Sequence, residues 1–222
     1  MTRPAVIVFD VNETLSDLSA IATRFTDVGL PAHLVPTWFA SVLRDGFALS
    51  TVGASEKFAV LADHQLRTLA EPGLLDRDLD AAVEHILTGF LGLPVHPDVV
   101  DGIRGLHAAG FRLVTLSNGA AQVAENLLGA AGVRDKFEHL LSVEDAGVWK
   151  PHRRAYEYAA QVAGVDPDRM LLVAVHPWDL DGAARAGMST AWIDRAGSTY
   201  PPFFAAPTHT VTALTDLPAA LG

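Results

Sequence analysis

The sequence predicts an α/β fold in which a doubly wound, mostly parallel sheet carries an inserted helical cap. Short apolar runs alternate with helical patterns over most of the chain, which is typical of a parallel sheet covered by helices on both faces. Residues 16–92 interrupt this alternation with helical patterns alone. In addition, 50% of the 222 residues are hydrophobic, which is enough to bury a sizeable core.

The predicted strands are continuous β-branched and aromatic runs, as expected where both faces of a parallel sheet are covered. The first run, AVIVFD, spans residues 5–10, and four more lie at residues 111–117, 139–142, 170–175 and 190–194. Helical patterns separate them at about residues 98–109, 120–131, 152–163 and 179–187. A glycine, the usual residue just beyond a helix C-terminus, stands where each helix should end: Gly110, Gly132, Gly164 and Gly187.

The segment after the first strand is expected to be helical throughout. Its four helical patterns lie at about residues 17–28, 32–48, 55–70 and 78–91. An insertion at this point lies above the C-terminal edge of the sheet, where ligands bind in such folds. We therefore expect two domains, a core formed by residues 1–15 and 93–222 and a helical cap formed by residues 16–92.

Composition and charge exclude several classes of protein. The net charge of −10 argues against a nucleic-acid or anionic-membrane surface, so neither partner is expected. The chain has no cysteine, which excludes disulfides, thiolate metal sites and a cysteine nucleophile. No apolar run approaches the roughly 20 residues of a membrane span, and the run before Asp10 is too short for a signal peptide. We expect a cytoplasmic protein.

Polar residues follow the predicted strands in order. Asp10 ends the first strand, Ser117 and Asn118 end the second, Lys150 follows the third, and Asp179 follows the fourth. Each has an ordinary structural explanation, as a turn residue, a helix cap or a surface lysine. Because parallel strands end at one edge of the sheet, we expect these side chains to meet there. A lysine can hold a carboxylate ionised, and a helix N-terminus favours anions.

These motifs, their spacing and the inserted cap resemble the haloacid-dehalogenase-like superfamily over essentially the whole chain. Within it, the sequence is most similar to the L-2-haloacid dehalogenases. The resemblance implies that Asp10 is the nucleophile, with Thr14 beside it. It also implies that Ser117 and Asn118 bind the carboxylate of the substrate.

The same resemblance implies roles for residues near the third and fourth strands. It makes Lys150 the lysine that balances the charge of the nucleophile, and it makes Tyr156 a tyrosine of the substrate pocket. It places Trp178 and Asp179 near the hydrolytic water, with Trp178 among the substrate contacts.

The position two residues after the nucleophile favours a dehalogenase over a phosphatase. Superfamily phosphatases resemble one another in carrying an acid there, but this chain has Asn12, which cannot protonate an alkoxide leaving group. A halide leaves without a proton, so we place Asn12 among the substrate contacts. Phosphatases also use an acid after strand four for Mg²⁺, where this chain has Val175. Asp179 and Asp181 lie close by and keep the phosphatase as an alternative.

Two positions depart from the dehalogenase pattern. After strand four the family reads Ser-Ser-Asn-x-Trp-Asp, whereas residues 174–179 read AVHPWD. His176 therefore stands at the amide position, as a water-positioning group, a base that titrates near neutrality, or a hydrogen-bonded turn residue. The family's halide-binding arginine aligns with Phe39, so Arg44, about one turn further on, is the candidate for that role; the alternative is a solvated arginine.

The expected function is that of an (S)-2-haloacid dehalogenase that uses no metal or other cofactor. Its substrate would be a small anion, a short 2-haloalkanoic acid. Asp10 would displace the halide to form an ester, and water activated by Asp179, with or without His176, would hydrolyse it. A homodimer is expected by resemblance. The alternatives are the Mg²⁺-dependent phosphatase and an inactive relative that only binds ligands.

Overall fold

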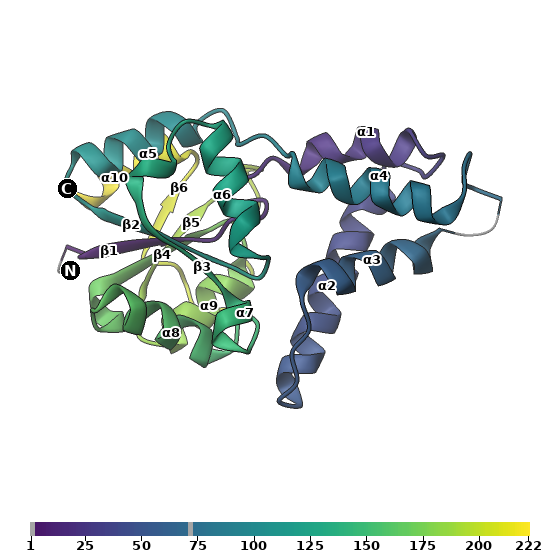
Figure 1. The fold of residues 1–222 in the computed structure, drawn as a ribbon. Helices are drawn as coiled ribbons and strands as arrows, with labels where there is room; N and C mark the ends of the chain where they lie inside the picture. Colours follow the sequence, from purple (N-terminus) through teal and green to yellow (C-terminus); the bar gives the residue numbers. More distant parts are fainter. Residues whose placement is uncertain (1–2, 71–72) are drawn as a thin grey trace.

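In the computed structural model, which describes residues 3–70 and 73–222, six strands form one sheet in the order β3-β2-β1-β4-β5-β6 (Figure 1). All neighbouring strands run parallel. The strands are β1 (Val6–Phe9), β2 (Arg112–Ser117), β3 (Phe137–Ser142), β4 (Met170–Ala174), β5 (Ser189–Ile193) and β6 (His209–Val211). The predicted doubly wound α/β fold is confirmed.

Helices cover both faces of this sheet (Figure 1). One face carries α5 (Val99–Ala108), α6 (Ala121–Ala130) and α10 (Leu217–Leu221), and the other carries α7 (Val143–Ala146), α8 (Arg153–Ala163) and α9 (Pro177–Arg185). Short 3₁₀ turns are η2 (Arg134–Lys136), η3 (Pro167–Arg169) and η4 (Leu214–Asp216). Alternate side chains of β1 enter the two separate cores, as strand geometry requires.

The central position of β1 brings the polar residues to one edge. All four residues of β1 are buried, and Phe9 pairs with Thr115 of β2 and Val173 of β4. The chain therefore leaves β1 at Asp10 between the C-terminal ends of two neighbouring strands. This is the arrangement in which parallel sheets bind ligands.

The segment between β1 and α5 forms a separate helical lobe beside the C-terminal edge of the sheet (Figure 1). It contains η1 (Leu18–Ala20), α1 (Ile21–Thr26), α2 (Leu34–Thr51), α3 (Phe58–Leu69) and α4 (Leu79–Leu91). Trp38 lies at the centre of the lobe, fully buried, and its ring packs on Phe25, Phe39 and Phe90. We refer to residues 16–92 as the cap; the domain boundary itself stays a proposal.

The two chain crossings between the core and the cap lie side by side. Ser16 and Val95 form an isolated antiparallel bridge. Backbone hydrogen bonds flank it, from Asp17 N to Pro94 O at 2.8 Å and from His96 N to Leu15 O at 2.9 Å. The cap is thus attached to the core through one short double strand.

The elements differ from the expected ones in four places. The helix expected at 17–28 divides into η1 and the short α1, and α2 continues to Thr51. β6 and α7 were not expected, because three-residue and four-residue elements carry too little periodicity to detect. The four helices expected to end at a glycine do so, and these glycines all have positive φ, from 67° at Gly164 to 101° at Gly187. Among the residues that the structure describes, no helix is long and apolar enough to cross a membrane.

Candidate active site

The carboxylate of Asp10 is the centre of a buried cluster of charged groups. Its Oδ1 atom lies 2.8 Å from Lys150 Nζ, and its Oδ2 atom accepts a 2.6 Å hydrogen bond from the Thr14 hydroxyl. The Nδ1 atom of His176 lies 3.1 Å from the same Oδ2 atom. Burial opposes ionisation, but Lys150 and His176 outweigh it and lower the pKa of Asp10 far below its usual range. The carboxylate is therefore charged at neutral pH.

Lys150 bridges two carboxylates inside the protein. The residue is fully buried, and Nζ lies 2.8 Å from Asp10 Oδ1 and 2.6 Å from Asp179 Oδ2. Burial alone would lower the pKa of the ammonium, but the two carboxylates raise it above its usual value. The Asn118 side chain accepts a 2.9 Å hydrogen bond from Lys150 N and so holds the backbone of this residue. Lys150 is a permanent cation in this site.

Asp179 is fully buried and both of its oxygens are occupied. Oδ2 faces Lys150, and Oδ1 accepts a 2.6 Å hydrogen bond from the Tyr156 hydroxyl. Burial and the nearby charge of Asp10 raise the pKa of Asp179, against the pull of Lys150. The two carboxylates thus differ, because Asp10 faces two cations and Asp179 faces only one.

His176 lies between two carboxylates, and each of its ring nitrogens faces one of them. Nδ1 faces Asp10, and Nε2 lies 2.8 Å from Oε2 of Glu13. Burial disfavours the charged ring, but the hydrogen bonds to these two carboxylates raise the pKa of His176 to about 9. At neutral pH the ring is an imidazolium that donates a hydrogen bond on each side.

Sequence reasoning missed Glu13. Its backbone has a φ of 63°, the left-handed region that non-glycine residues rarely adopt. Two contacts hold this turn, since Glu13 N donates to Ser16 Oγ at 3.2 Å and Glu13 O lies 2.9 Å from Nε2 of His96. A carboxylate three residues after the nucleophile was the only available signal, and no pattern ties it to His176.

The predicted anion-binding residues lie beside the cluster and are buried. Ser117 Oγ accepts a 2.9 Å hydrogen bond from Gly119 N, which leaves its own proton to donate. The Asn118 side chain hydrogen-bonds to both polar backbone atoms of Lys150, with Nδ2 lying 3.4 Å from the carbonyl oxygen. Asn12 is buried and its amide nitrogen lies near Gly119. Asn118 thus supports the lysine, while Ser117 and Asn12 stay available to a ligand.

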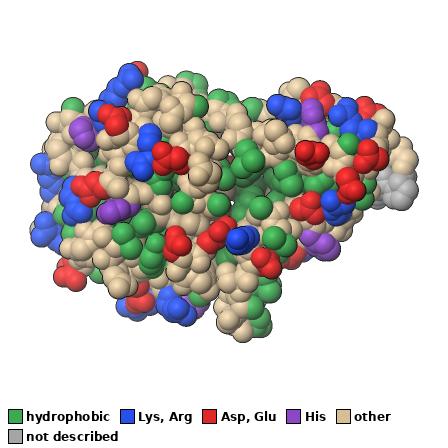
Figure 2. Space-filling view, in the orientation of Figure 1, with side chains coloured by type: hydrophobic (Ala, Val, Ile, Leu, Met, Phe, Trp, Pro, Cys, Tyr) green, Lys and Arg blue, Asp and Glu red, His purple; other side chains and the backbone are tan. Residues whose placement is uncertain are grey.

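Aromatic side chains from both lobes surround His176. The ring of Phe39, from the cap, stacks on the His176 ring with centroids 6.5 Å apart. On the core side, the centroid of the Trp178 ring lies 5.1 Å from that of His176. The Trp178 ring in turn packs edge-on against Phe47 of α2, with ring centroids 4.9 Å apart. Figure 2 shows hydrophobic side chains gathered around the hollow between core and cap. Apolar rings from the cap and the core therefore flank His176 in the cluster.

Two predicted residues do not join the cluster. The side chain of Arg44 is 66% exposed and pairs with Asp45 at 2.7 Å, because its position on α2 faces solvent. Asp181, considered as a metal ligand, instead binds Arg185 at 2.7 Å and accepts a hydrogen bond from Ala205 N at 2.9 Å. Tyr156 is brought to the cluster, but it is fully buried and bonded to Asp179.

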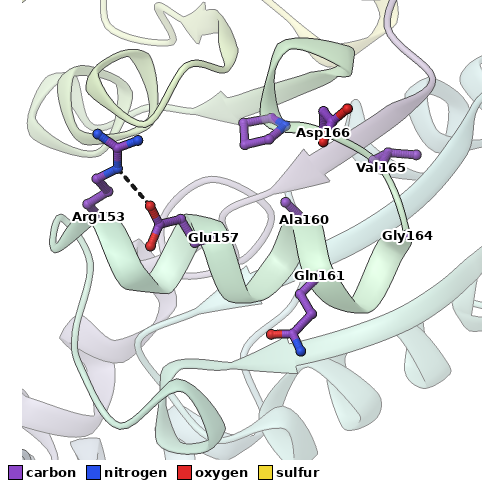
Figure 3. A pocket seen from close by; sticks show the side chains of 8 residues that line it. Arg153, Glu157, Ala160, Gln161, Gly164, Val165 and Asp166 are labelled. Carbon is purple, nitrogen blue, oxygen red and sulfur yellow. Dashed lines mark hydrogen bonds and ion pairs between the residues drawn. The ribbon is translucent and has the colours of Figure 1, made fainter.

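A cavity of 330 Å³ is lined in part by Glu13, the residue that holds Nε2 of His176. Its walls come from the start of the cap: Leu18, Ser19, Ala22, Ala32, Val35 and Pro36. A larger depression, shown in Figure 3 with the Arg153–Glu157 ion pair at its rim, lies along α8 and contains no residue of the cluster.

The cluster does not fit a magnesium ion. Mg²⁺ takes oxygen ligands, but both Asp10 oxygens face N–H or O–H donors. Val175 offers an apolar side chain, and its N–H donates to Thr14 Oγ1 at 3.1 Å. Within residues 3–70 and 73–222, no group of three or more His, Cys, Asp or Glu side chains is placed to hold a metal.

Comparison with known proteins agrees with this fold. Residues 4–187 match the model of the haloacid dehalogenase-like hydrolase family. The chain therefore belongs to the haloacid dehalogenase-like hydrolases. It is 34% identical to the (S)-2-haloacid dehalogenase of Pseudomonas sp. (strain YL), over 94% of this chain and 90% of that protein.

Two further relatives extend this likeness. Haloacetate dehalogenase H-2 of Moraxella sp. (strain B) is 30% identical over 95% of both chains. A crystal structure of an L-2-haloacid dehalogenase superposes with a TM-score of 0.90 at 27% identity and covers 99% of both chains. The likeness thus extends over the cap as well as the core.

Proposed function

We propose that this protein is an (S)-2-haloacid dehalogenase, which hydrolyses the carbon–halogen bond of short 2-haloalkanoic acids. The observation that carries this proposal is the state of Asp10, a buried carboxylate kept ionised by Lys150 and His176 with no acid two residues further on. An ionised carboxylate is a nucleophile, and a halide needs no proton to leave. The named dehalogenases among its relatives support the substrate class.

In the first step a carboxylate oxygen of Asp10 attacks C2 of the substrate from the side opposite the halogen. A C–O bond forms, the C–halogen bond breaks with its electron pair leaving on the halide, and C2 is inverted. Ser117 Oγ, Asn12 Nδ2 and backbone N–H groups at the start of α6 are suited to hold the substrate carboxylate. Fixing that group orients C2 toward the nucleophile.

In the second step water attacks the carbonyl carbon of the Asp10 ester. Asp179 is poorly placed as the base, because Lys150 and Tyr156 hold its two oxygens inside the protein and the residue has no exposed surface for water to reach. His176 Nδ1 lies 3.1 Å from Oδ2 of the Asp10 carboxylate, the group that becomes the ester, and the His176 side chain is 13% exposed. We therefore assign the base to His176 and assign Asp179 to holding Lys150.

The ester itself prepares His176 for this role. While Asp10 is charged, two carboxylates keep the imidazole protonated. Ester formation removes one of these negative charges, so the pKa of His176 falls and a proton leaves past the half-exposed Glu13. The neutral ring then takes a proton from the attacking water, and the alcohol product leaves as Asp10 regains its charge. The overall balance is one 2-haloacid and one water giving a 2-hydroxy acid, a proton and a halide.

The test is halide release from (S)-2-chloropropionate in the presence of EDTA. We expect activity with the chelator present, and its loss in Asp10→Asn. Hydrolysis of an aryl phosphate that EDTA abolishes would instead support the Mg²⁺-dependent phosphatase. A folded chain that acts on neither substrate would support the inactive binding protein.

The cytoplasmic location and the homodimer belong to the same proposal. The resemblance to the dehalogenases is the support for both. Light scattering of the purified chain, with an expected mass of twice 23.6 kDa, tests the dimer.

A further inference from the structure

Trp149 belongs to the core by sequence, but its side chain is inserted into the cap. It lies in the loop between α7 and α8, with 1% of its surface exposed. The indole Nε1 donates a 2.9 Å hydrogen bond to Glu56 O, and the ring stacks on Phe58 with centroids 6.0 Å apart. The backbone N–H donates to Ser50 Oγ at 2.9 Å. Three cap residues thus bind this one loop residue.

Gly46 makes room for this insertion. A Cβ atom at Gly46 would lie 2.5 Å from Cδ2 and 2.6 Å from Cζ3 of Trp149, well inside van der Waals contact. Gly46 stands inside α2, where glycine costs about 1 kcal/mol relative to alanine. The close approach of the indole explains why the helix carries this unfavourable residue.

The next residue in the chain is Lys150, and two successive N–H groups point to different lobes. Trp149 N donates to Ser50 Oγ of the cap, whereas Lys150 N donates to Asn118 Oδ1 of the core. The ammonium of Lys150 then reaches Asp10 Oδ1. Any movement of the cap away from the core must therefore pull on the backbone that carries the lysine, or withdraw the indole from the cap.

We propose that Trp149 is a positioning residue that couples seating of the cap to placement of the Lys150 ammonium against Asp10. With the cap seated, Lys150 is fully buried and Asp10 has its cation. With the cap displaced, Trp149 draws Lys150 out of line and Asp10 loses a cation that keeps it ionised. The enzyme is thereby active only when the cap excludes bulk water. The kinetic consequence rests on the proposed function, but the coupling itself does not.

Amine labelling tests the coupling without any assay of activity. The chain has three lysines, so Lys150 can be followed by peptide mass spectrometry with Lys136, in the core, as the internal reference. We expect Lys150 to resist an amine-reactive ester in the wild-type chain. Gly46→Ala should raise its labelling rate at least tenfold relative to Lys136, because the added methyl group displaces the indole.

Gly129→Ala is the matched control, since Gly129 lies inside α6 with open space around its Cβ position. It should label like the wild type. Ser50→Ala is a second test in case Gly46→Ala fails to fold, because it removes the acceptor of the Trp149 N–H without adding bulk. We expect Ser50→Ala to raise the labelling rate of Lys150 several-fold relative to Lys136. A folded Gly46→Ala chain and a Ser50→Ala chain that both protect Lys150 as well as the wild type overturn the coupling.

The pH profile of halide release separates positioning from a general loss of stability. Loosening Lys150 raises the pKa of Asp10, so the acid limb of kcat/KM should move to higher pH in Gly46→Ala. In Gly46→Ala/Trp149→Leu the steric clash is relieved, and we expect recovered folding with kcat still low. Recovery of kcat to the wild-type value would show that Trp149 contributes only to packing, and would overturn its role as a positioning residue. If the wild type releases no halide, the proposed function fails while the labelling result still decides the coupling.

Discussion

The hydroxyl of Tyr156 lies 2.6 Å from Oδ1 of Asp179, and neither residue is exposed to solvent. The same hydroxyl lies 3.0 Å from the Asp179 carbonyl oxygen, so it fixes both the side chain and the backbone. Burial and the charge of Asp179 raise the pKa of Tyr156 well above its usual value, which keeps the phenol a hydrogen-bond donor. Tyr156 therefore acts on the site through Asp179 and the lysine that Asp179 holds.

Tyr156→Phe should lower kcat for halide release and leave KM nearly unchanged. The substitution leaves Asp179 with one partner instead of two, and loss of a hydrogen bond to a charged group costs about 1.5–3 kcal/mol of stability. Steady-state kinetics and urea unfolding check both effects. The control is Tyr158→Phe on the same helix, whose half-buried side chain lies outside the cluster. An equal fall of kcat in Tyr156→Phe and Tyr158→Phe would contradict the role of Tyr156 in holding Asp179.

Lys150→Met should destabilise the protein by about 3–5 kcal/mol at neutral pH, because it leaves two buried carboxylates without their common cation. Without the lysine the pKa values of Asp10 and Asp179 rise. Stability should therefore recover as pH falls and the carboxylates take up protons. Urea unfolding at pH 5 and pH 7.5 measures this. Lys136→Met, which breaks a surface pair with Asp135, should change stability by less than about 1 kcal/mol.

The stability of the wild-type chain should fall as pH rises from about 6.5 to about 9. The pKa of His176 is raised from 6.5 to about 9 by Asp10 and Glu13, so its contribution is complete below 6.5 and is lost as pH rises through 9. The contribution is about 3 kcal/mol. His176→Gln should flatten this part of the curve, whereas substitution of the exposed His107 should not. Chemical unfolding at several pH values makes the comparison.

His176→Gln should also trap the ester on Asp10. Glutamine fills the space but cannot accept a proton from water, so hydrolysis of the ester slows by about 10²–10⁴-fold. Rapid quench with 2-chloropropionate, followed by mass analysis of the Asp10 peptide, should show the adduct. Glu13→Gln should give a smaller loss, about tenfold, because it only misorients the ring. Rapid turnover without an adduct in His176→Gln would return the base to Asp179.

Asn12→Asp should not create a phosphatase. The new carboxylate adds negative charge beside Asp10, but the Asp10 oxygens still face Lys150, Thr14 and His176. Aryl phosphate hydrolysis with Mg²⁺ should stay at the wild-type level, and halide release should fall. Asn126→Asp, on the exposed face of α6, is the control for added charge. Phosphatase activity in Asn12→Asp alone would show that the site admits a metal.

The positions of five strands along the chain and of the motifs that follow them were predictable, because both follow from local patterns. A buried parallel strand is a continuous apolar run, and the residue after it must lie at the C-terminal edge of the sheet. This rule predicts that Asp10, Ser117, Lys150 and Asp179 lie close together. The geometry agrees, with Lys150 Nζ within 2.8 Å of both Asp10 and Asp179.

The contacts of individual side chains were harder to predict, for different reasons. Glu13 reaches His176 only through a positive φ, which nothing in a Val-Asn-Glu-Thr sequence requires. Arg44 was chosen by its distance along the chain from Phe39, but the turn of the helix puts its side chain in solvent. Trp149 is apolar in a loop, and only the tertiary structure reveals that it enters the cap.

The paired crossings at Ser16 and Val95 make the cap a replaceable module. Because the inserted segment begins and ends at one antiparallel bridge, its two attachment points are adjacent, and segments of other length and shape can be grafted there without changing the register of the sheet. Evolution can then alter what the enzyme admits by exchanging the lobe, while the charged residues at the strand ends stay in place. In this chain such an exchange also has to accommodate Trp149, whose indole is buried against Gly46, Glu56 and Phe58 of the present cap.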